Sequence, residues 1–223
     1  MSKQLVLFGA SGAVGSAVAN QAIAAGWDVA GLGRTAPDLP GVEGHALDLQ
    51  DAPAIADLFA AWDRPVDAVV FAQGYQPAHN LEETTASHMR TMLDVHVTGT
   101  LLALQALRPH INPGASVVLM SSIAATKGSY DASYAAAKGA VSSLVRSLAR
   151  EWFGLARVNA VAPGLIADSP VHQSMTPEHA AKHSERMFGN ELVRPEQVAS
   201  AIAHLTENTA LNGAVLAVDG GYV

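Results

Sequence analysis

Two tyrosines and a lysine recur at four-residue intervals near the middle of the chain, as Tyr130, Tyr134 and Lys138. In a helix, residues at this spacing share one face. A free phenol has a pKa of about 10 and exchanges protons poorly near neutrality. An ammonium about 4 Å from a phenolate is worth about 4 kcal/mol at an effective dielectric constant of about 20. Such a neighbour would lower the pKa of the phenol by up to about three, which suits a general acid or base.

The two tyrosines differ in what lies one turn ahead of them. Tyr134 has Lys138 there, whereas Tyr130 has only Tyr134 and precedes the helix in a Gly-Ser-Tyr-Asp turn. We therefore predict that Tyr134 is the acid/base, tuned by Lys138. Tyr130 is expected in a loop over the pocket, as a substrate contact.

A pair of serines, Ser121 and Ser122, follows an apolar run and so comes at the carboxyl edge of an expected strand. A hydroxyl there can donate to a carbonyl oxygen and stabilise the charge that develops on it. The alternative for either serine is a hydroxyl that satisfies the backbone at a strand end.

Glycines recur at every third residue of Gly-Ala-Ser-Gly-Ala-Val-Gly, between the first apolar run and the first helical stretch. Glycines allow a tight turn and a close approach of the backbone to a pyrophosphate, and the following helix offers free N–H groups. The alternative is a glycine-rich turn that serves helix packing. The predicted phosphate-binding residues are Gly9, Ser11, Gly12, Ala13, Val14 and Gly15.

The end of the second apolar run indicates which dinucleotide is bound. An NAD site usually has an acidic residue there for the ribose 2′-hydroxyl. This chain has Gly33-Arg34-Thr35 instead, and a guanidinium can pair with a 2′-phosphate. NADP(H) is therefore preferred, with NAD(H) as the alternative and a solvated surface arginine as the other reading of Arg34.

Short apolar runs alternate with helical stretches along the whole chain, and these elements must position the groups above. The runs are nearly continuous, which is typical of parallel strands buried on both faces. Strands are predicted at Leu5–Phe8, Val29–Leu32, Val66–Phe71, Val117–Met120, Val158–Ala162 and Val215–Val218. Helices are predicted at Ala13–Ala25, Ala52–Ala61, Ser87–His110, Tyr134–Phe153 and Pro195–Thr206. The alternation predicts an α/β fold, a Rossmann-like doubly wound parallel sheet in a single domain over residues 1–223.

Three stretches read as irregular: residues 35–44, 73–85 and 165–193. The last is the longest and follows a predicted strand end. Ligands of doubly wound sheets bind at the carboxyl ends of the strands. We therefore expect residues 165–193 to cover the substrate.

Composition excludes several classes of function. The chain has 13 lysines and arginines against 20 aspartates and glutamates, a formal net charge of −7. That balance argues against nucleic-acid and anionic membrane partners. There is no cysteine, which excludes disulfides and thiolate chemistry. No apolar run approaches the ~20 residues of a membrane span, and no signal peptide precedes the first strand-like run, so a cytoplasmic protein is expected.

Two other catalytic classes find little support. His179 and His183 share a helix face, but no third ligand of suitable spacing accompanies them, so no metal site is predicted. A Ser-His-Asp hydrolase would need a Gly-x-Ser-x-Gly elbow, which the sequence lacks.

Taken together, these motifs resemble the short-chain dehydrogenase/reductase family over essentially the whole chain. The resemblance is carried by Gly-Ala-Ser-Gly-Ala-Val-Gly, Asp48-Leu49, Phe71-Ala-Gln-Gly74, Ser-Ser-Ile-Ala-Ala, Tyr134-x-x-x-Lys138, Arg157-Val-Asn-Ala-Val-Ala-Pro-Gly-Leu-Ile166 and the C-terminal Val-Asp-Gly-Gly-Tyr-Val. It implies that Tyr134 is the general acid/base, that Lys138 also holds a ribose, and that Ser122, rather than Ser121, polarises the carbonyl. It further implies cofactor contacts at Asp48, which would bind the adenine amino group, and at Leu49, Ala72, Gly74, Pro163, Gly164 and Ile166, the last through its backbone.

The sequence departs from the family pattern at four places. The glycines are spaced G-x-x-G-x-x-G, with Ala13 in the middle place of the ordinary pattern. Phe71-Ala-Gln-Gly74 replaces Asn-Asn-Ala-Gly, which is expected to remove amides that brace the sheet end. His96 stands where the catalytic asparagine is usual, as either a proton-passing group or an ordinary helix histidine. Asp168 replaces a threonine near the nicotinamide, as either a carboxamide acceptor or a turn residue.

The resemblance implies an oxidoreductase that reduces a ketone to an alcohol with NADPH, reversibly, with 3-oxoacyl thioesters as one substrate class. A small-molecule carbonyl or alcohol is the expected substrate. The resemblance also implies a homodimer or homotetramer through the Tyr134 helix and the helix before it. An epimerase or dehydratase with bound cofactor, or a nucleotide-sensing protein without turnover, is the alternative.

Overall fold

The apolar runs form a sheet of seven parallel strands in the computed structural model, which describes residues 2–223. The strands are β1 (Gln4–Phe8), β2 (Asp28–Gly33), β3 (Val42–Ala46), β4 (Val66–Phe71), β5 (Ile111–Met120), β6 (Ala156–Pro163) and β7 (Val215–Val218). Their order is β3-β2-β1-β4-β5-β6-β7, so the chain reverses its direction of travel between β1 and β4. This reversal is the topological switch point of a doubly wound sheet, which confirms the predicted fold class.

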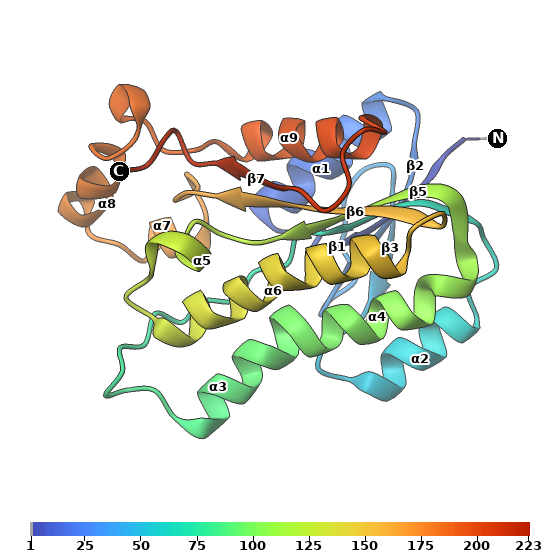
Figure 1. Cartoon of the computed structure of the whole chain (residues 1–223), viewed down its shortest axis with the longest axis horizontal. Helices are drawn as coiled ribbons and strands as arrows, with labels where there is room; N and C mark the ends of the chain where they lie inside the picture. Colours follow the sequence, from blue (N-terminus) through green and yellow to red (C-terminus); the bar gives the residue numbers. More distant parts are fainter. Residues whose placement is uncertain (1) are drawn as a thin grey trace.

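Helices cover both faces of the sheet (Figure 1). On one face lie α1 (Ala13–Ala24) and α9 (Pro195–Glu207), and on the other lie α2 (Ala52–Ala60), α4 (Gly99–Leu107) and α6 (Ala132–Glu151). The remaining helices are α3 (Ala86–Leu93), α5 (Ala124–Lys127), α7 (Pro170–Gln173) and α8 (Pro177–Ser184). A π-helical turn, η1 (Asp94–Thr98), joins α3 to α4, and 3₁₀ turns form η2 (Arg108–His110) and η3 (Phe188–Asn190).

The sheet separates two hydrophobic cores, because the side chains of each strand alternate between its faces. Phe8 stacks on Phe71 at 4.3 Å between ring centroids, on the face covered by α2, α4 and α6. On the other face, Leu7 packs with side chains of α1 and α9. Burial of each such side chain stabilises the fold by about 1.5–3 kcal/mol. The continuous apolar runs are therefore explained by burial on both faces.

The sequence analysis did not predict the edge strand β3 and placed much of it in the irregular stretch 35–44. Its sequence is Val-Glu-Gly-His-Ala, and none of its residues is fully buried. It pairs only with β2, from Val29↔Val42 to Gly33↔Ala46. A strand at the edge of a sheet needs little apolar character, which removes the signal used to find it.

The helix predicted over Ser87–His110 is interrupted, which corrects its assignment as one element. The π-helical turn η1 inserts an extra residue per turn between α3 and α4 and shifts the buried face of the helix. As a result His96, the middle residue of η1, is 2% exposed. Local propensity gives no signal for such a turn.

The stretch 165–193 contains α7, α8 and η3 and is therefore more regular than predicted. Ser169 and Thr176 cap α7 and α8, accepting hydrogen bonds from the N–H groups of His172 and His179. Proline follows each cap at the first helical position. Ser-Pro and Thr-Pro are helix-start signals that were available in the sequence.

Close packing of α4 yields a test of the fold. A Cβ at Gly99 would overlap the carbonyl oxygen of Leu49, whereas a Cβ at Gly139, on α6, would meet no atom within 4 Å. We expect Gly99→Ala to lower the free energy of unfolding by about 1–3 kcal/mol through overpacking. The matched control, Gly139→Ala, should raise it by up to about 1 kcal/mol, since alanine favours helices. Urea unfolding measures both, and equal effects would contradict the packing described for α4.

Candidate active site

Helix α6 places Tyr134 and Lys138 one turn apart on the same face. The Lys138 Nζ lies 5.6 Å from the centroid of the Tyr134 ring. Lys138 is 2% exposed, and its ammonium donates to the carbonyl oxygen of Met120 at 2.8 Å. Met120 is the last residue of β5, so the pair lies at the carboxyl edge of the sheet, where doubly wound folds bind ligands.

Burial controls the protonation of this pair. It lowers the pKa of Lys138 to about 7, because the charged form loses its hydration. Burial also raises the pKa of Tyr134, with a smaller lowering by the Ser122 hydroxyl and a further raising by the charge of Asp131. The expected net lowering of the phenol pKa is therefore wrong for the chain alone, because burial raises the pKa of Tyr134.

The hydroxyls of the two serines after β5 have different hydrogen-bond partners. The Ser121 hydroxyl is buried, donates to the Lys138 carbonyl oxygen at 3.1 Å and lies 2.7 Å from the Ser142 hydroxyl. It therefore fastens β5 to α6. The Ser122 hydroxyl interacts instead with the Tyr134 phenol and accepts from Ala124 N at 3.1 Å. The geometry agrees with the choice of Ser122 over Ser121.

The π-helical turn directs His96 at the same phenol. The His96 and Tyr134 rings meet edge to face, 5.8 Å between centroids. The Nε2 atom lies 2.9 Å from the carbonyl oxygen of Tyr75, so Nε2 carries the proton and Nδ1 is an acceptor. Burial, and then the charge of Lys138, lower the pKa of His96 to about 3. The imidazole is consequently neutral at physiological pH.

Gln73 braces the end of β4, contrary to the expectation that this stretch has lost its bracing amides. Its Nε2 lies 3.3 Å from the Thr100 hydroxyl and 3.5 Å from the Val95 carbonyl oxygen, both on the segment that holds His96. A Cβ at Gly9 would lie 2.5 Å from the backbone nitrogen of Gln73. The backbone of Gln73 and the first glycine are therefore in close contact, which is why Gly9 has no side chain.

The glycine loop fits a bound pyrophosphate. Gly9 adopts a φ of 74°, and a Cβ at Gly15 would overlap the Gly9 carbonyl oxygen. The helix that follows has no side-chain cap and no acidic residue in its first turn. Its first N–H groups and its dipole thus favour an anion. Ser11, Gly12, Ala13 and Val14 form the rest of this loop and the helix start.

Arg34 directly follows β2 and is exposed. Its side chain makes no hydrogen bond or ion pair with any part of the described chain, residues 2–223. The Ser11 hydroxyl lies 3.7 Å from the Cβ position of Gly33, so the glycine loop and the end of β2 adjoin. Leu47 N donates to the Gly33 carbonyl oxygen at 2.7 Å, which brings Asp48 and Leu49 to the same edge.

The predicted nicotinamide end follows β6. Gly164 N donates to the Val218 carbonyl oxygen at 3.0 Å, and a Cβ on Gly164 would overlap Met187. Ile166 pairs with Val193 in an isolated parallel bridge. These contacts hold both ends of the segment 165–193 at the carboxyl edge of the sheet. Pro163 ends β6, while Ala72 and Gly74 follow β4 at that same edge.

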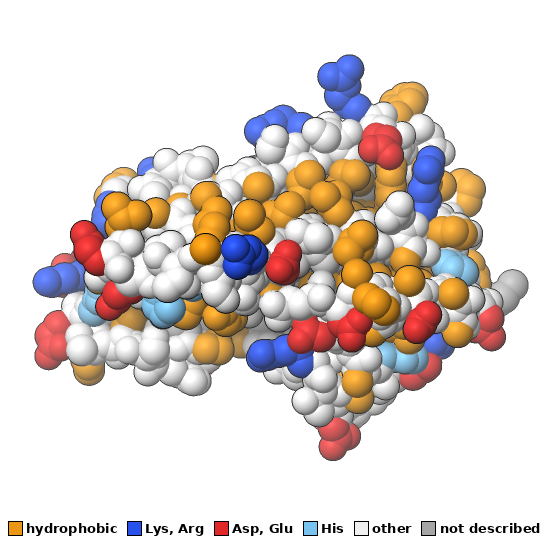
Figure 2. Space-filling model, turned by 90° about the horizontal axis from the view of Figure 1, so that it is seen from below, with side chains coloured by type: hydrophobic (Ala, Val, Ile, Leu, Met, Phe, Trp, Pro, Cys, Tyr) orange, Lys and Arg blue, Asp and Glu red, His pale blue; other side chains and the backbone are white. Residues whose placement is uncertain are grey.

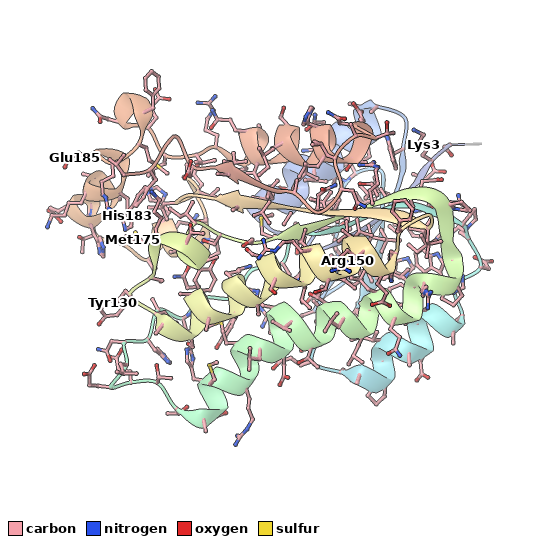
Figure 3. The ribbon with its side chains drawn as sticks, in the orientation of Figure 1. Lys3, Tyr130, Arg150, Met175, His183 and Glu185 are labelled. Carbon is pink, nitrogen blue, oxygen red and sulfur yellow. The ribbon has the colours of Figure 1, made fainter. Side chains whose placement is uncertain are left out.

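Asp168, whose role the sequence leaves open, and Tyr130, the predicted substrate contact, lie at the outer rim. Asp168 is exposed with a φ of 58°, and its backbone N–H donates to His172 Nδ1 at 3.0 Å, as in a turn. Tyr130 is 69% exposed and accepts a hydrogen bond from Asn80 Nδ2 at 3.0 Å. Figure 3 shows Tyr130, Met175 and His183 at one end of the molecule and Lys3 at the opposite end.

Sequence reasoning missed a buried group next to Tyr134. Asp131 caps α6 and is fully buried, together with His88 and Ser133. An aspartate three residues before the first apolar-periodic residue is a capping signal that could have found it. The burial of the carboxylate has no signal in the sequence.

Other kinds of site find no support in the described part of the chain. Within residues 2–223, no group of three or more histidines, aspartates or glutamates could hold a metal ion. The His179 and His183 rings stack, and His183 Nδ1 lies 3.1 Å from the Tyr222 hydroxyl. No helix among the described residues is both long and apolar enough to cross a membrane.

Residues 9–223 match the family described as "Enoyl-(Acyl carrier protein) reductase". The chain is 35% identical to a cis-4-hydroxycyclohexanecarboxylate dehydrogenase from Sinomonas cyclohexanicum, over 81% of this chain and 75% of that one. It is 32% identical to a 3-oxoacyl-[acyl-carrier-protein] reductase from Rattus norvegicus, over 99% and 98% of the two chains. A short chain dehydrogenase family protein from Francisella tularensis has the same fold, with a TM-score of 0.90 at 19% identity, covering 100% and 99% of the two chains.

These matches extend over nearly the whole chain and agree with the Rossmann-like sheet and the glycine loop described above. The family implies a nicotinamide dinucleotide as cofactor. The chain is therefore a member of the short-chain dehydrogenase/reductase family, an oxidoreductase acting on alcohol and carbonyl groups.

Proposed function

We propose that the protein is an NADP(H)-dependent carbonyl reductase that interconverts a ketone and a secondary alcohol through Ser122, Tyr134 and Lys138. The observation that carries the proposal is the convergence of these side chains at the carboxyl edge of the sheet. The exposed Arg34 beside the glycine loop supports the choice of NADP(H). Cofactor contacts are proposed at the residues predicted from the sequence.

A nicotinamide held at the carboxyl edge of the sheet would supply the hydride, and residues of the chain act on the oxygen of the substrate. Ser122 donates a hydrogen bond to the carbonyl oxygen and stabilises the negative charge that develops there. Tyr134 transfers its phenolic proton to that oxygen, which completes the alcohol. A phenol whose pKa is raised by burial is protonated at neutral pH and so is ready to act as an acid. Lys138 stabilises the phenolate that remains.

The relatives suggest the substrate class. One is named as acting on a 3-oxoacyl thioester and another on a cyclic hydroxy acid. Met175 and Met187 in the segment 165–193 would suit an apolar substrate portion, and this segment is proposed as the substrate cover. We therefore propose a ketone with an apolar body, with 3-oxoacyl thioesters as the first class to assay.

Helices α4 and α6 are proposed to form the contact of a homodimer or homotetramer. Leu101, Leu102, Ala106 and Leu144 on these helices are only partly buried. Figure 2 views the molecule from below the orientation of Figure 1, on the side where α4 lies, and shows hydrophobic side chains gathered across that face. Sedimentation velocity tests the assembly, and a monomer at micromolar concentration would contradict it.

The first experiment separates the two tyrosines in an assay of NADPH oxidation over a panel of ketones. We expect Tyr134→Phe to reduce kcat by at least about 100-fold, since it removes the proton donor, while NADPH affinity measured by fluorescence stays nearly unchanged. Tyr130→Phe is the matched control and should mainly change KM, because Tyr130 lies at the exposed rim.

Other outcomes of the NADPH oxidation assay would indicate a different residue assignment or a different function. Exchange of the two behaviours would overturn the assignment of Tyr134. Turnover of substrate without stoichiometric NADPH consumption would indicate an epimerase or dehydratase. Tight NADPH binding without oxidation over the whole panel would indicate a binding protein.

Arg34 provides a test of cofactor choice. We expect Arg34→Ala to weaken NADPH binding by about 10–100-fold, because a charge-assisted contact with the 2′-phosphate is lost, and to leave NADH binding nearly unchanged. Arg64→Ala is the matched control, since Arg64 is also a surface arginine but pairs with Glu43 at 2.6 Å. A wild-type preference for NADH would refute the assignment of NADP(H).

His96 is proposed to hold or pass a proton beside Lys138 in place of an asparagine. Its pKa of about 3 in the folded chain lies below the unfolded value of about 6.5. Between these pH values the unfolded state binds one more proton than the folded state. The contribution of His96 to stability is therefore complete above about pH 6.5 and is lost as the pH falls towards 3, on the order of several kcal/mol in all.

We accordingly expect His96→Asn to flatten the loss of stability between about pH 6.5 and 3, while most of kcat is kept because asparagine also donates and accepts. Urea unfolding at several pH values measures the first effect. His204→Asn, at an exposed position of α9, is the control and should leave the pH dependence unchanged. A collapse of kcat in His96→Asn would contradict simple replacement of the asparagine.

A further inference from the structure

The carboxylate of Asp131 is fully buried at the start of α6, three residues before Tyr134. Its Oδ1 accepts hydrogen bonds from the backbone N–H groups of Ser133 at 3.0 Å and of Tyr134 at 3.1 Å, and from the Ser133 hydroxyl. Its Oδ2 accepts from the N–H of His79 at 3.3 Å. The carboxylate therefore holds the backbone of the proposed acid/base directly.

His88, from α3, completes this cluster and is 7% exposed. Its Nε2 lies 2.8 Å from the Ser133 hydroxyl oxygen and 3.4 Å from Asp131 Oδ2. The single Ser133 hydroxyl proton points to Asp131, so Ser133 accepts from His88 and the proton of the imidazole is on Nε2. The His79 ring packs against His88 at 4.4 Å between centroids.

The cluster joins α6 to α3, and α3 continues directly into the turn that carries His96. Tyr134 is consequently held at two places. Its backbone is bound by Asp131, and its ring is contacted by His96. The loop 73–85 is fastened at both places as well, through His79 N on Asp131 and the Tyr75 carbonyl oxygen on His96. A shift of α3 would thus move both supports of the phenol.

Burial and charge distinguish Asp131 from an ordinary helix cap. Helices α3, α7 and α8 are capped by neutral hydroxyls, and α2 is capped by the exposed Asp51. Capping alone thus requires neither burial nor a charge. Hydrogen bonds hold the pKa of Asp131 below its usual value despite the opposing effect of burial, so the group is a carboxylate at neutral pH. That negative charge raises the pKa of Tyr134.

We propose that Asp131, held by His88 and Ser133, is the positioning residue of Tyr134, the proton donor for carbonyl reduction, and that its buried negative charge adds to burial in disfavouring the phenolate. The proposal rests on the proposed function. The titratable groups that face Asp131 are His79, His88 and Tyr134, and those that face the phenol are Asp131, His96 and Lys138. Within the cluster, His88 acts as a hydrogen-bond donor, and Asp131 supplies the negative charge near the phenol.

The test combines an absorbance titration of the phenol with the pH profile of kcat/KM. The Tyr134 phenol is titrated as the difference between each variant and the same variant carrying Tyr134→Phe. We expect Asp131→Asn to titrate about one pH unit lower, because the opposing charge is gone. The fall of kcat/KM for reduction at high pH should move by the same amount. Asp51→Asn, the matched control at the cap of α2, should change neither.

His88 variants separate the hydrogen bond from general loss of structure. We expect His88→Ala to reduce kcat by about 10-fold with little change in KM, because the cluster loses its donor. His88→Gln, which retains an N–H donor at similar reach, should restore kcat to within about threefold of wild type. These two variants also test the proposal if Asp131→Asn fails to fold, as judged by circular dichroism.

The outcomes distinguish this inference from the proposed function. Absence of NADPH oxidation in the wild type would refute the reductase, whereas the phenol titration would still report on Asp131. An unchanged phenol titration in a folded Asp131→Asn, or an equal shift in Asp51→Asn, would overturn the role of the buried charge. Equal losses in His88→Ala and His88→Gln would overturn the positioning role.

Discussion

The rest of the site depends on one contact: the buried Lys138 ammonium donates a hydrogen bond to the backbone at the end of β5. An ammonium out of water is costly unless it has acceptors, and the Met120 carbonyl oxygen supplies one. This contact requires that α6 lie close against the carboxyl end of β5. The Ser121 hydroxyl, which donates to the Lys138 carbonyl oxygen, fixes the same two elements at that point. The position of Tyr134, one turn before Lys138, follows from these two contacts.

Burial, together with nearby charges, determines the protonation states of the groups around Lys138. Burial, and then the Lys138 ammonium, lower the pKa of His96 and keep it neutral, so this histidine can replace an asparagine without adding a second positive charge. Burial, and to a lesser extent the charge of Asp131, raise the pKa of Tyr134 further above neutrality. The site therefore holds one basic group that titrates near neutrality, Lys138, between a neutral imidazole and a neutral phenol. Groups with separated pKa values can take distinct roles in proton transfer.

The sequence predicted the fold class, six of the seven strands and the grouping of Ser122, Tyr134 and Lys138, because burial and helical spacing leave periodic signals. It failed where stability comes from contacts distant in the chain. β3 is held by its pairing with β2 and has little apolar character. The η1 turn interrupts an otherwise continuous helical pattern. The raised pKa of Tyr134 reflects desolvation, which spacing alone cannot report.

Two departures from the family pattern lie in segments that are joined by hydrogen bonds. Gln73 stands in place of the family alanine in the stretch after β4, and its side-chain amide reaches the carbonyl oxygen of Val95, next to His96. His96 in turn donates to the Tyr75 carbonyl oxygen, two residues beyond Gln73. The loop after β4 and the η1 turn are thus tied by reciprocal hydrogen bonds. A change at either position alone would remove one of the hydrogen bonds that join the two segments.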